Sequence, residues 1–281
     1  MSYYKCPYCG WSRELKKGLY LTCPECSSPL IIEVQPRGKL ISKNTGIWRY
    51  SNFLPNFHVK PTLGEGGTFL SNAKRLREKL GLRNLYVKDE GRNPTGAFTD
   101  RGAAIVVAAT LYYGYRKIIS KVPGDVAASL AAYSAAYNLD FTTFFNESFQ
   151  LEKLYQVALF GGKIVDKEEE AGEGYKVRPG DPFLIEGYKT ISFEIYEALG
   201  EVDTVIAPIG HGSLVYSLWK GFKELQDVYN VRVPRIIGVQ AKGCSPIVNS
   251  FNKGLRKVVE TSDCSTIARE IAVPRPLRGK E

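Results

Sequence analysis

Four cysteines near the start of the chain are arranged as two Cys-x-x-Cys pairs separated by 13 residues. The pairs are Cys6 with Cys9 and Cys23 with Cys26. Each pair can turn two thiolates toward one ion, and two pairs complete the tetrahedral sulfur site that suits zinc. We therefore predict a structural zinc ribbon over residues 1–38. Disulfides within the pairs fit a cytosolic chain poorly, and no thioredoxin-like unit surrounds them for a redox role.

Two glycine-containing turns are placed where helices should begin. Gly210-His211-Gly212-Ser213 follows the apolar run 204–208, and Pro123-Gly124-Asp125 follows the run 117–120. A turn that opens a helix offers backbone N–H groups and the positive helix end to an anion. We predict an anion site at the first turn, where His211 either faces solvent or adds a donor. The second turn is also explained simply as a turn with an N-cap for the next helix.

The elements that carry these turns follow from the hydrophobic pattern. Strands and helices alternate after residue 85, which predicts parallel strands with helical crossovers. The predicted strands are 85–87, 117–120, 141–145, 163–165, 204–208 and 235–240. The predicted helices are 102–114, 126–137, 149–160, 184–199 and 214–226. We also predict ribbon strands near 19–21 and 30–32, a basic amphipathic helix at 71–82 with Ala73, Leu76 and Leu80 on one face, and a loop rich in Glu and Gly at 167–181.

Composition narrows the class of protein. The 281 residues are 44% hydrophobic, enough for a substantial core. The sequence has no apolar run of about 18 residues, so no membrane helix is predicted. The first residues lack the apolar core of a signal peptide, and we therefore expect a cytoplasmic protein with no membrane partner. The net charge is +9, but basic residues are dispersed apart from a small tail at Arg275, Arg278 and Lys280. Without a reader motif, we expect no nucleic-acid binding. A single Met hints at a thermophilic source.

The stretch Lys88-Asp89-Glu90-Gly91-Arg92-Asn93-Pro94-Thr95-Gly96-Ala97-Phe98-Thr99-Asp100-Arg101-Gly102 resembles the cofactor-lysine segment of the fold-type II pyridoxal phosphate enzymes, and of threonine synthases in particular. Further segments resemble that family in the same order, among them 48–50, 62–68, 186–190 and 264–273. The resemblance implies an α/β protein with two open, twisted, mostly parallel sheets, as in the tryptophan synthase β fold, and an amino-terminal zinc ribbon. The implied division is a ribbon at 1–38, a large α/β domain at 39–95 and 182–281 that is cut short at its carboxy-terminal end, and a small α/β domain at 96–181.

The resemblance also assigns roles within the site. The family's second motif lysine carries pyridoxal phosphate as a Schiff base; Thr99 stands at that position, and a hydroxyl cannot form an aldimine. Gly124 matches the loop that meets the cofactor ring oxygen, but Asp125 replaces an asparagine, and a carboxylate repels a phenolate. The turn Gly210-His211-Gly212-Ser213 matches the phosphate loop.

Two further parts of the implied site complete this assignment. Asn93, Thr95 and Gly96 fall near the family's substrate-anion pocket. The partner of the pyridine nitrogen would lie beyond the last residue of the sequence. Zinc is thus the expected cofactor, and Schiff-base use of pyridoxal phosphate is not expected.

Two functions remain open. In the first, the chain is a threonine synthase homologue without Schiff-base catalysis that binds a small anionic ligand or a partner protein. In the second, it is an active threonine synthase that converts O-phosphohomoserine to threonine and phosphate with pyridoxal phosphate. Thr99 and Asp125 favour the first, and the chain-wide resemblance favours the second. A homodimer is implied by the resemblance only.

Overall fold

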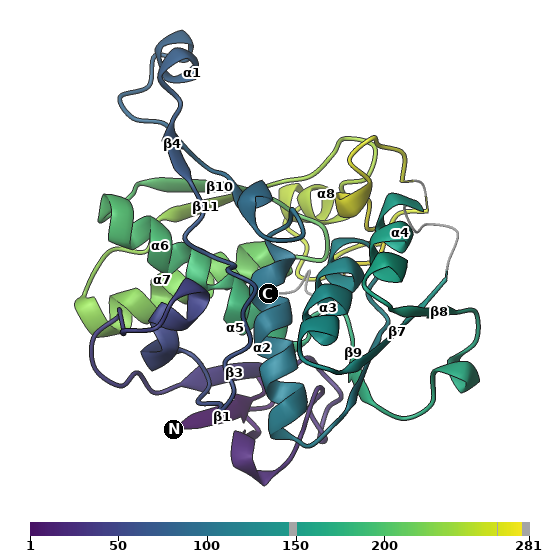
Figure 1. Cartoon of the computed structure of the whole chain (residues 1–281). Coiled ribbons are helices and arrows are strands. Elements are labelled where there is room, and N and C mark those ends of the chain that lie inside the picture. Colours follow the sequence, from purple (N-terminus) through teal and green to yellow (C-terminus); the bar gives the residue numbers. More distant parts are fainter. Residues whose placement is uncertain (146–150, 263, 277–281) are drawn as a thin grey trace.

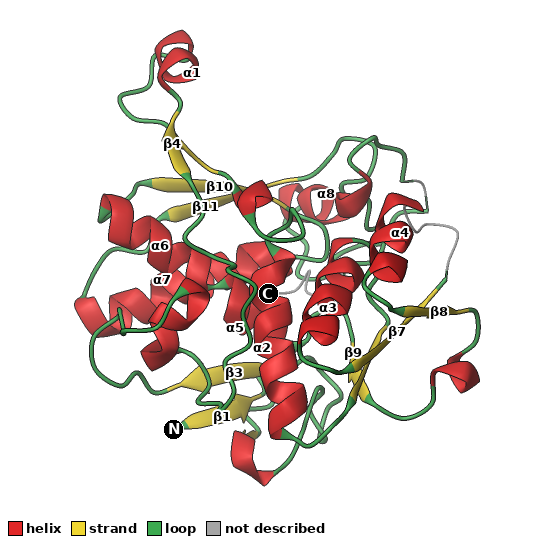
Figure 2. Ribbon diagram, in the orientation of Figure 1, coloured by secondary structure: helices red, strands yellow, loops and turns green. Residues whose placement is uncertain are grey.

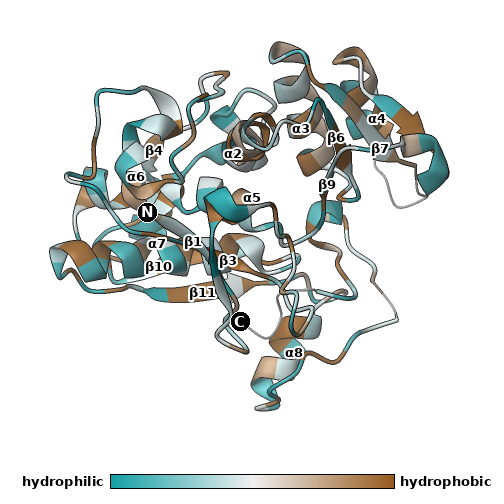
Figure 3. Cartoon of the chain, turned by 90° about the horizontal axis from the view of Figure 1, so that it is seen from below, coloured by the Kyte–Doolittle hydropathy of each residue, from teal (hydrophilic) through white to brown (hydrophobic). Residues whose placement is uncertain are grey.

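A buried helix, α2 (Thr99–Tyr112), runs through the middle of the molecule (Figure 1). The structure is a computed structural model that describes residues 1–145, 151–262 and 264–276. Helix α2 is rich in Ala and Val and is buried on every side from Thr99 to Thr110. It packs against helices on both sides, α3 (Asp125–Ala136) and α5 (Pro182–Tyr188). In Figure 3 the helix is seen nearly end-on, and its hydrophobic residues lie inside the molecule.

A four-stranded parallel sheet lies beside α3, with strand order β8-β7-β6-β9. Its strands are β6 (Lys117–Ser120), β7 (Asp140–Phe144), β8 (Lys163–Val165) and β9 (Tyr175–Val177). Helices α3 and α4 (Leu151–Leu159) connect the first three strands. The predicted α/β class with a parallel sheet is confirmed. The prediction of a continuous loop over 167–181 is wrong, because Tyr175 and Val177 are buried and form an edge strand beside β6.

Four α-helices, one two-stranded sheet and long loops make up the described part of the chain after residue 181 (Figure 2). The predicted helix 184–199 is divided into α5 and α6 (Thr190–Leu199), and α7 (Ser213–Tyr229) and α8 (Pro246–Asn252) follow. Strands β10 (Thr204–Pro208) and β11 (Arg235–Val239) pair in parallel. Apart from the four-stranded sheet and the amino-terminal ribbon, the described residues contain this two-stranded parallel pair and, in the first half of the chain, one antiparallel hairpin.

The amino-terminal ribbon is a three-stranded antiparallel sheet of order β2-β1-β3. Its strands are β1 (Ser2–Lys5), β2 (Ser12–Glu14) and β3 (Ile31–Val34). The predicted strand near 30–32 is confirmed with a one-residue shift. The predicted strand near 19–21 is wrong, since this segment is irregular and Tyr20 instead packs edge-on against Tyr4 and Trp11.

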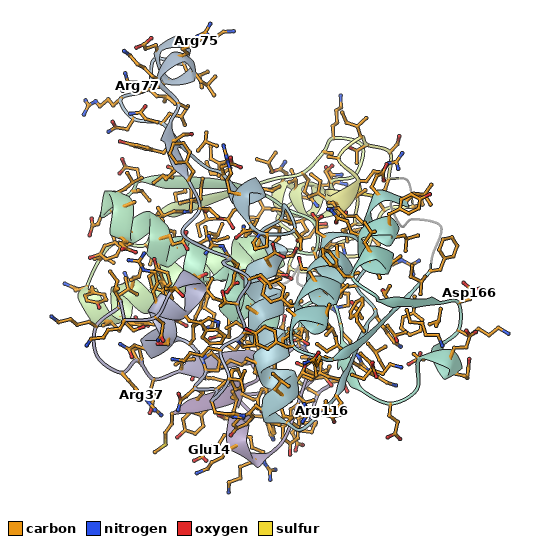
Figure 4. All side chains as sticks on the ribbon, in the orientation of Figure 1. Glu14, Arg37, Arg75, Arg77, Arg116 and Asp166 are labelled. Atoms are coloured by element: carbon orange, nitrogen blue, oxygen red, sulfur yellow. A yellow bond between two sulfur atoms is a disulfide. The ribbon has the colours of Figure 1, made fainter. Side chains whose placement is uncertain are left out.

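An arm projects from the body of the molecule between β4 (Leu70–Asn72) and β5 (Tyr86–Lys88), which pair antiparallel (Figure 1). Its helix α1 spans only Lys74–Lys79, shorter than the predicted 71–82. None of its residues is buried, so no apolar face docks and lengthens the helix. Figure 4 shows Arg75 and Arg77 at the tip of this arm.

Most other helix boundaries fall within about three residues of the prediction. The largest shift at a site element is α2, which begins at Thr99 rather than 102. Residues 149 and 150 of the predicted helix 149–160 lie outside the described residues, as do Arg278 and Lys280 of the basic tail. Among the described residues, no helix combines the length and apolarity needed to span a bilayer.

Candidate functional site

A network of buried charges holds the start of α2. The guanidinium of Arg101 is fully buried and donates to Glu90 Oε2 at 2.7 Å and to Glu194 Oε1 at 2.7 Å. Lys88 Nζ lies 2.6 Å from Glu194 Oε2 and 2.6 Å from the carbonyl oxygen of Thr68. Burial would raise the pKa of Glu194, but Arg101 and Lys88 outweigh it and lower that pKa to about 2. The network joins β5, α2 and α6, and it makes Lys88 a structural counter-ion.

Thr99 is buried at the first turn of α2, among other hydroxyl groups. Its Oγ1 lies 2.7 Å from Ser129 Oγ on α3, and Thr95 Oγ1 lies 3.1 Å from the same oxygen. Asp100 accepts hydrogen bonds from the Thr95 backbone N–H and hydroxyl, both at 2.7 Å. Burial raises the pKa of Asp100. The position predicted for the cofactor amine is therefore a hydroxyl cluster that joins α2 to α3.

Asn93 and Gly96 shape the turn before α2. The Asn93 side chain accepts from the Gly66 N–H at 3.0 Å and donates to the Glu90 carbonyl oxygen at 2.8 Å. Gly96 adopts φ +84°, a left-handed conformation that favours glycine. Its N–H donates to the Asn93 carbonyl oxygen at 2.8 Å. Asn93 and Thr95 are buried, so the structure uses these predicted pocket residues within the turn itself.

The amino end of α3 brings two carboxylates together. Gly124 precedes the helix at φ +69°, and Asp125 forms an ion pair of 2.5 Å with Lys153 on α4. The carboxylate of Glu270, near the other end of the chain, reaches the same point and accepts a hydrogen bond from the Asp125 backbone. A Cβ atom on Gly124 would lie 2.5 Å from the oxygens of Glu270. Glu270 is exposed as a whole residue, but its carboxylate lies against the start of α3. Desolvation of the carboxylate there, together with the neighbouring Asp125, raises the pKa of Glu270 to about 7.

The turn Gly210-His211-Gly212-Ser213 opens the longest described helix, α7. Gly212 has φ +95° and Ser213 is the first helical residue. Burial lowers the pKa of His211, which keeps its imidazole neutral, and its buried Nδ1 has no hydrogen-bond partner among the described residues. A Cβ atom on Gly210 would lie 3.3 Å from the carbonyl oxygen of Glu270.

Taken together, these contacts connect the amine, ring-oxygen and phosphate positions of the sequence prediction. Thr99 contacts Ser129, which lies one helical turn after Asp125 on α3. Glu270 then bridges Asp125 to the turn at Gly210. Sequence reasoning missed Ser129 and Glu270. The spacing of Ser129 from Asp125 on a predicted helix was a usable signal, but nothing local in the sequence connects residue 270 to the start of α3.

The four cysteines of the ribbon converge. Their Sγ atoms all lie within 4.8 Å of one another, and two cross-pair distances are 3.5 Å. Zinc–thiolate bonds of about 2.3 Å place tetrahedral sulfurs roughly 3.8 Å apart, so the donor set fits one zinc ion. Each pair is closed by a tight backbone turn, with Gly10 at φ +78° after the first and Ser27 at φ +57° after the second.

The other two cysteines form a disulfide, Cys244–Cys264, which the sequence analysis did not predict. It joins the segment before α8 to the segment that leads to Glu270. The backbone beside it is also paired, because Ser265 N donates to the carbonyl oxygen of Gly243 at 3.1 Å.

The sequence profile of the family described as "Pyridoxal-phosphate dependent enzyme" matches residues 61–280. The chain belongs to this family. It is 33% identical to the threonine synthase of Methanocaldococcus jannaschii over 97% of this chain and 74% of that protein. It is 29% identical to the threonine synthase of Methanosarcina acetivorans over 99% of this chain and 74% of that protein.

Two solved structures share the fold of this chain. A threonine deaminase from Solanum lycopersicum superposes with a TM-score of 0.62 at 24% identity, covering 74% of this chain and 62% of that chain. Maize serine racemase gives a TM-score of 0.65 at 22% identity, covering 73% of this chain and 65% of that chain. This chain thus spans less than two thirds of either solved structure, and both likenesses bear on the fold alone.

Proposed function

We propose that this threonine synthase homologue binds a small anionic ligand without Schiff-base chemistry. The observation that carries the proposal is Thr99, a buried hydroxyl bonded to Ser129 at the position that the motif assigns to the cofactor lysine. A hydroxyl cannot condense with an aldehyde to give an imine. Lys88, the other lysine of the motif, is engaged by Glu194 and by the Thr68 carbonyl.

The neighbouring groups also fit an internal Schiff base poorly. Pyridoxal phosphate supplies an electron sink when it is bound through an amine, and its ring oxygen is best met by a hydrogen-bond donor. Here the side chains at the start of α3 are the carboxylates of Asp125 and Glu270. Two carboxylates at this point disfavour a phenolate oxygen. We therefore derive no step that uses the cofactor.

Anion binding is supported by the turn before α7. The first N–H groups of a 17-residue helix lack partners within the helix and carry its positive end. His211 adds a half-buried imidazole whose buried Nδ1 is unpaired within the described part of the chain. Phosphate or sulfate suits such a set of neutral donors. A partner protein that presents an acidic group to this turn is the other form of the same proposal.

An active threonine synthase is the second candidate. One observation favours it, namely the 33% identity to a threonine synthase over 97% of this chain. In that case a lysine elsewhere in the chain would have to form the Schiff base, because residue 99 is a threonine.

The two candidates differ in their reaction with pyridoxal phosphate. We expect no internal-aldimine absorbance band after the cofactor is added, and no site-specific lysine adduct after borohydride reduction and peptide mass mapping. The unfolded chain, treated in the same way, measures non-specific labelling of exposed lysines. A stoichiometric adduct on one lysine, with threonine formed from O-phosphohomoserine, would overturn the proposal in favour of the second candidate.

Ligand binding is tested separately by titration calorimetry with sulfate. We expect saturable binding that His211→Asp abolishes, because the new carboxylate repels an anion at the α7 turn. His58→Asp is the matched control, since His58 is the only other histidine and is exposed. Equal sulfate affinity in both variants would contradict the placement of the site at Gly210–Ser213.

A further inference from the structure

A short piece of the carboxy-terminal part of the chain lies against the turn of the proposed anion site, Gly210–Ser213, and against the turn Pro123–Asp125 at the start of α3. We propose that residues 269–273 form an internal strap that closes this site, fastened to the amino end of α3 by the carboxylate of Glu270. The inference rests on the proposed function for the identity of the site, but the strap itself is defined by contacts within the chain. In Figure 1 the yellow carboxy-terminal segment passes beside α3 and α4.

The strap contacts each turn through a different group. The Glu270 side chain meets Gly124 and accepts a hydrogen bond from the Asp125 backbone, as a ligand anion would at a helix start. The strap backbone and Val273 face Gly210, where an added Cβ would lie 3.3 Å from the Glu270 carbonyl oxygen and 3.4 Å from Val273 Cγ2. A ligand that spans the two turns therefore competes with the strap for the same space.

The strap is anchored on both flanks. The disulfide Cys244–Cys264 fixes the residues before it, and Thr261 N donates to the Pro274 carbonyl oxygen at 3.3 Å beyond it. Between the anchor and the strap, Ser265 and Ala268 are exposed, Thr266 is half-buried, and Ile267 is fully exposed. Opening therefore needs the loss of the Glu270 and Gly210 contacts but no disruption of the core.

The charges around Glu270 give the strap a pH dependence. Asp125 faces it from α3, Lys153 faces it from α4, and the Gly210 turn contributes only the neutral imidazole of His211. Desolvation of the carboxylate and the charge of Asp125 raise the pKa of Glu270 to about 7, against the opposing effects of the Asp125 backbone hydrogen bond and of Lys153. The closed strap therefore binds a proton more tightly than the open strap. Closure of the strap is strongest at a pH below the usual pKa of a free glutamate side chain, and it weakens as the pH rises toward 7.

Hydrogen exchange measured by mass spectrometry tests the strap directly. Peptides that cover 264–276 are followed between pH 5 and pH 8, and the rates are corrected for intrinsic amide chemistry. We expect opening to increase about tenfold, because each pKa unit corresponds to a factor of ten and an exposed carboxylate keeps only part of its shift. Glu270→Gln, which stays neutral, should remove this increase. Glu260→Gln is the matched control, because Glu260 pairs with Arg275 at the surface.

The ligand arm separates failure of the strap from failure of the proposed function. Sulfate is the probe, because its charge is constant between pH 5 and pH 8. We expect wild-type affinity to rise several-fold with pH, and Glu270→Ala to bind with the higher affinity throughout, with circular dichroism confirming that the variant is folded. Suppose that Glu270→Gln removes the pH effect on hydrogen exchange but no variant binds sulfate. This result would support the strap and refute the proposed function. A pH effect on exchange that persists in Glu270→Gln, or its absence from the wild type, would overturn the strap.

Discussion

Replacement of Arg101 by methionine should remove a large share of the protein's stability. Arg101 is fully buried and lies between Glu90 and Glu194, whose side chains are 18% and 5% exposed. Methionine has a similar length but cannot donate a hydrogen bond. The change leaves the Glu90 carboxylate without its cation and Glu194 with Lys88 alone.

The size of the effect follows from two independent estimates. Removal of one partner from a buried ion pair typically costs about 3–5 kcal/mol of unfolding free energy. The pKa of Glu194 falls from 4.5 to about 2, and at about 1.4 kcal/mol per unit this corresponds to roughly 3.5 kcal/mol, the net effect of Arg101 and Lys88 against desolvation. Because this pKa is lowered by folding, the stabilisation is present above pH 4.5 and is lost as the pH falls toward 2. We expect Arg101→Met to lower the unfolding free energy at pH 7 by about 3 kcal/mol or more and to flatten this acid limb.

Urea unfolding monitored by circular dichroism at pH 7 and at acid pH measures both effects. Arg232→Met is the control, because Arg232 forms an exposed ion pair with Asp203 and its loss should change stability by less than about 0.5 kcal/mol. A loss below about 1 kcal/mol for Arg101→Met, or an unchanged acid limb, would show that the network does not support α2 as described.

Three further changes test other parts of the structure. Removal of zinc by a chelator, or Cys23→Ser, should unfold the ribbon, because structural zinc sites supply the folding free energy of small ribbons. Metal analysis should give one zinc per chain before treatment, and a ribbon that stays folded after treatment would refute the zinc site. Reduction of the disulfide Cys244–Cys264, whose cysteines are 20 residues apart in the sequence, should lower the unfolding free energy by about 3 kcal/mol. Urea unfolding with and without dithiothreitol measures this loss, and an unchanged unfolding midpoint would contradict it. Gly187→Ala should lower the unfolding free energy by about 1–3 kcal/mol, because the new Cβ would lie 2.1 Å from the Arg101 carbonyl oxygen. A thermal unfolding temperature equal to that of the wild type would exclude this tight contact between α2 and α5.

Local sequence pattern predicted the elements that carry the site. Strands 117–120, 163–165 and 204–208 appear with the predicted bounds, because short apolar runs between turn signals identify strands well. The helix in the arm at 70–88 was harder to predict than these strands. The pattern of Leu76 and Leu80 indicated an apolar face but could not show whether any other part of the protein packs on it. Both leucines are about half exposed.

Long-range pairing explains most of what the sequence could not predict. Strand β9 pairs with β6, and its Tyr175 is buried beside Tyr115 and Phe183. No local period in the sequence encodes these long-range contacts. The disulfide and the position of Glu270 depend equally on where distant segments meet. The division of the chain into a ribbon, a large domain and a small domain therefore stays a prediction from resemblance. A cytoplasmic location stays a prediction from composition.

The motif from Lys88 to Gly102 combines two separable tasks. Lys88, Glu90 and Arg101 satisfy one another and Glu194 in the core, and Asn93 fixes the turn between them. None of these contacts involves residue 99, whose hydroxyl is satisfied by Ser129. The scaffold can thus hold its shape with or without an amine at this position, which is why the motif predicts the fold well while the chemistry depends on one side chain. Thr99→Lys alone should not produce an aldimine band with pyridoxal phosphate, because Asp125 and Glu270 would still occupy the start of α3. A band produced by that single change would show that residue 99 alone separates this chain from its catalytic relatives.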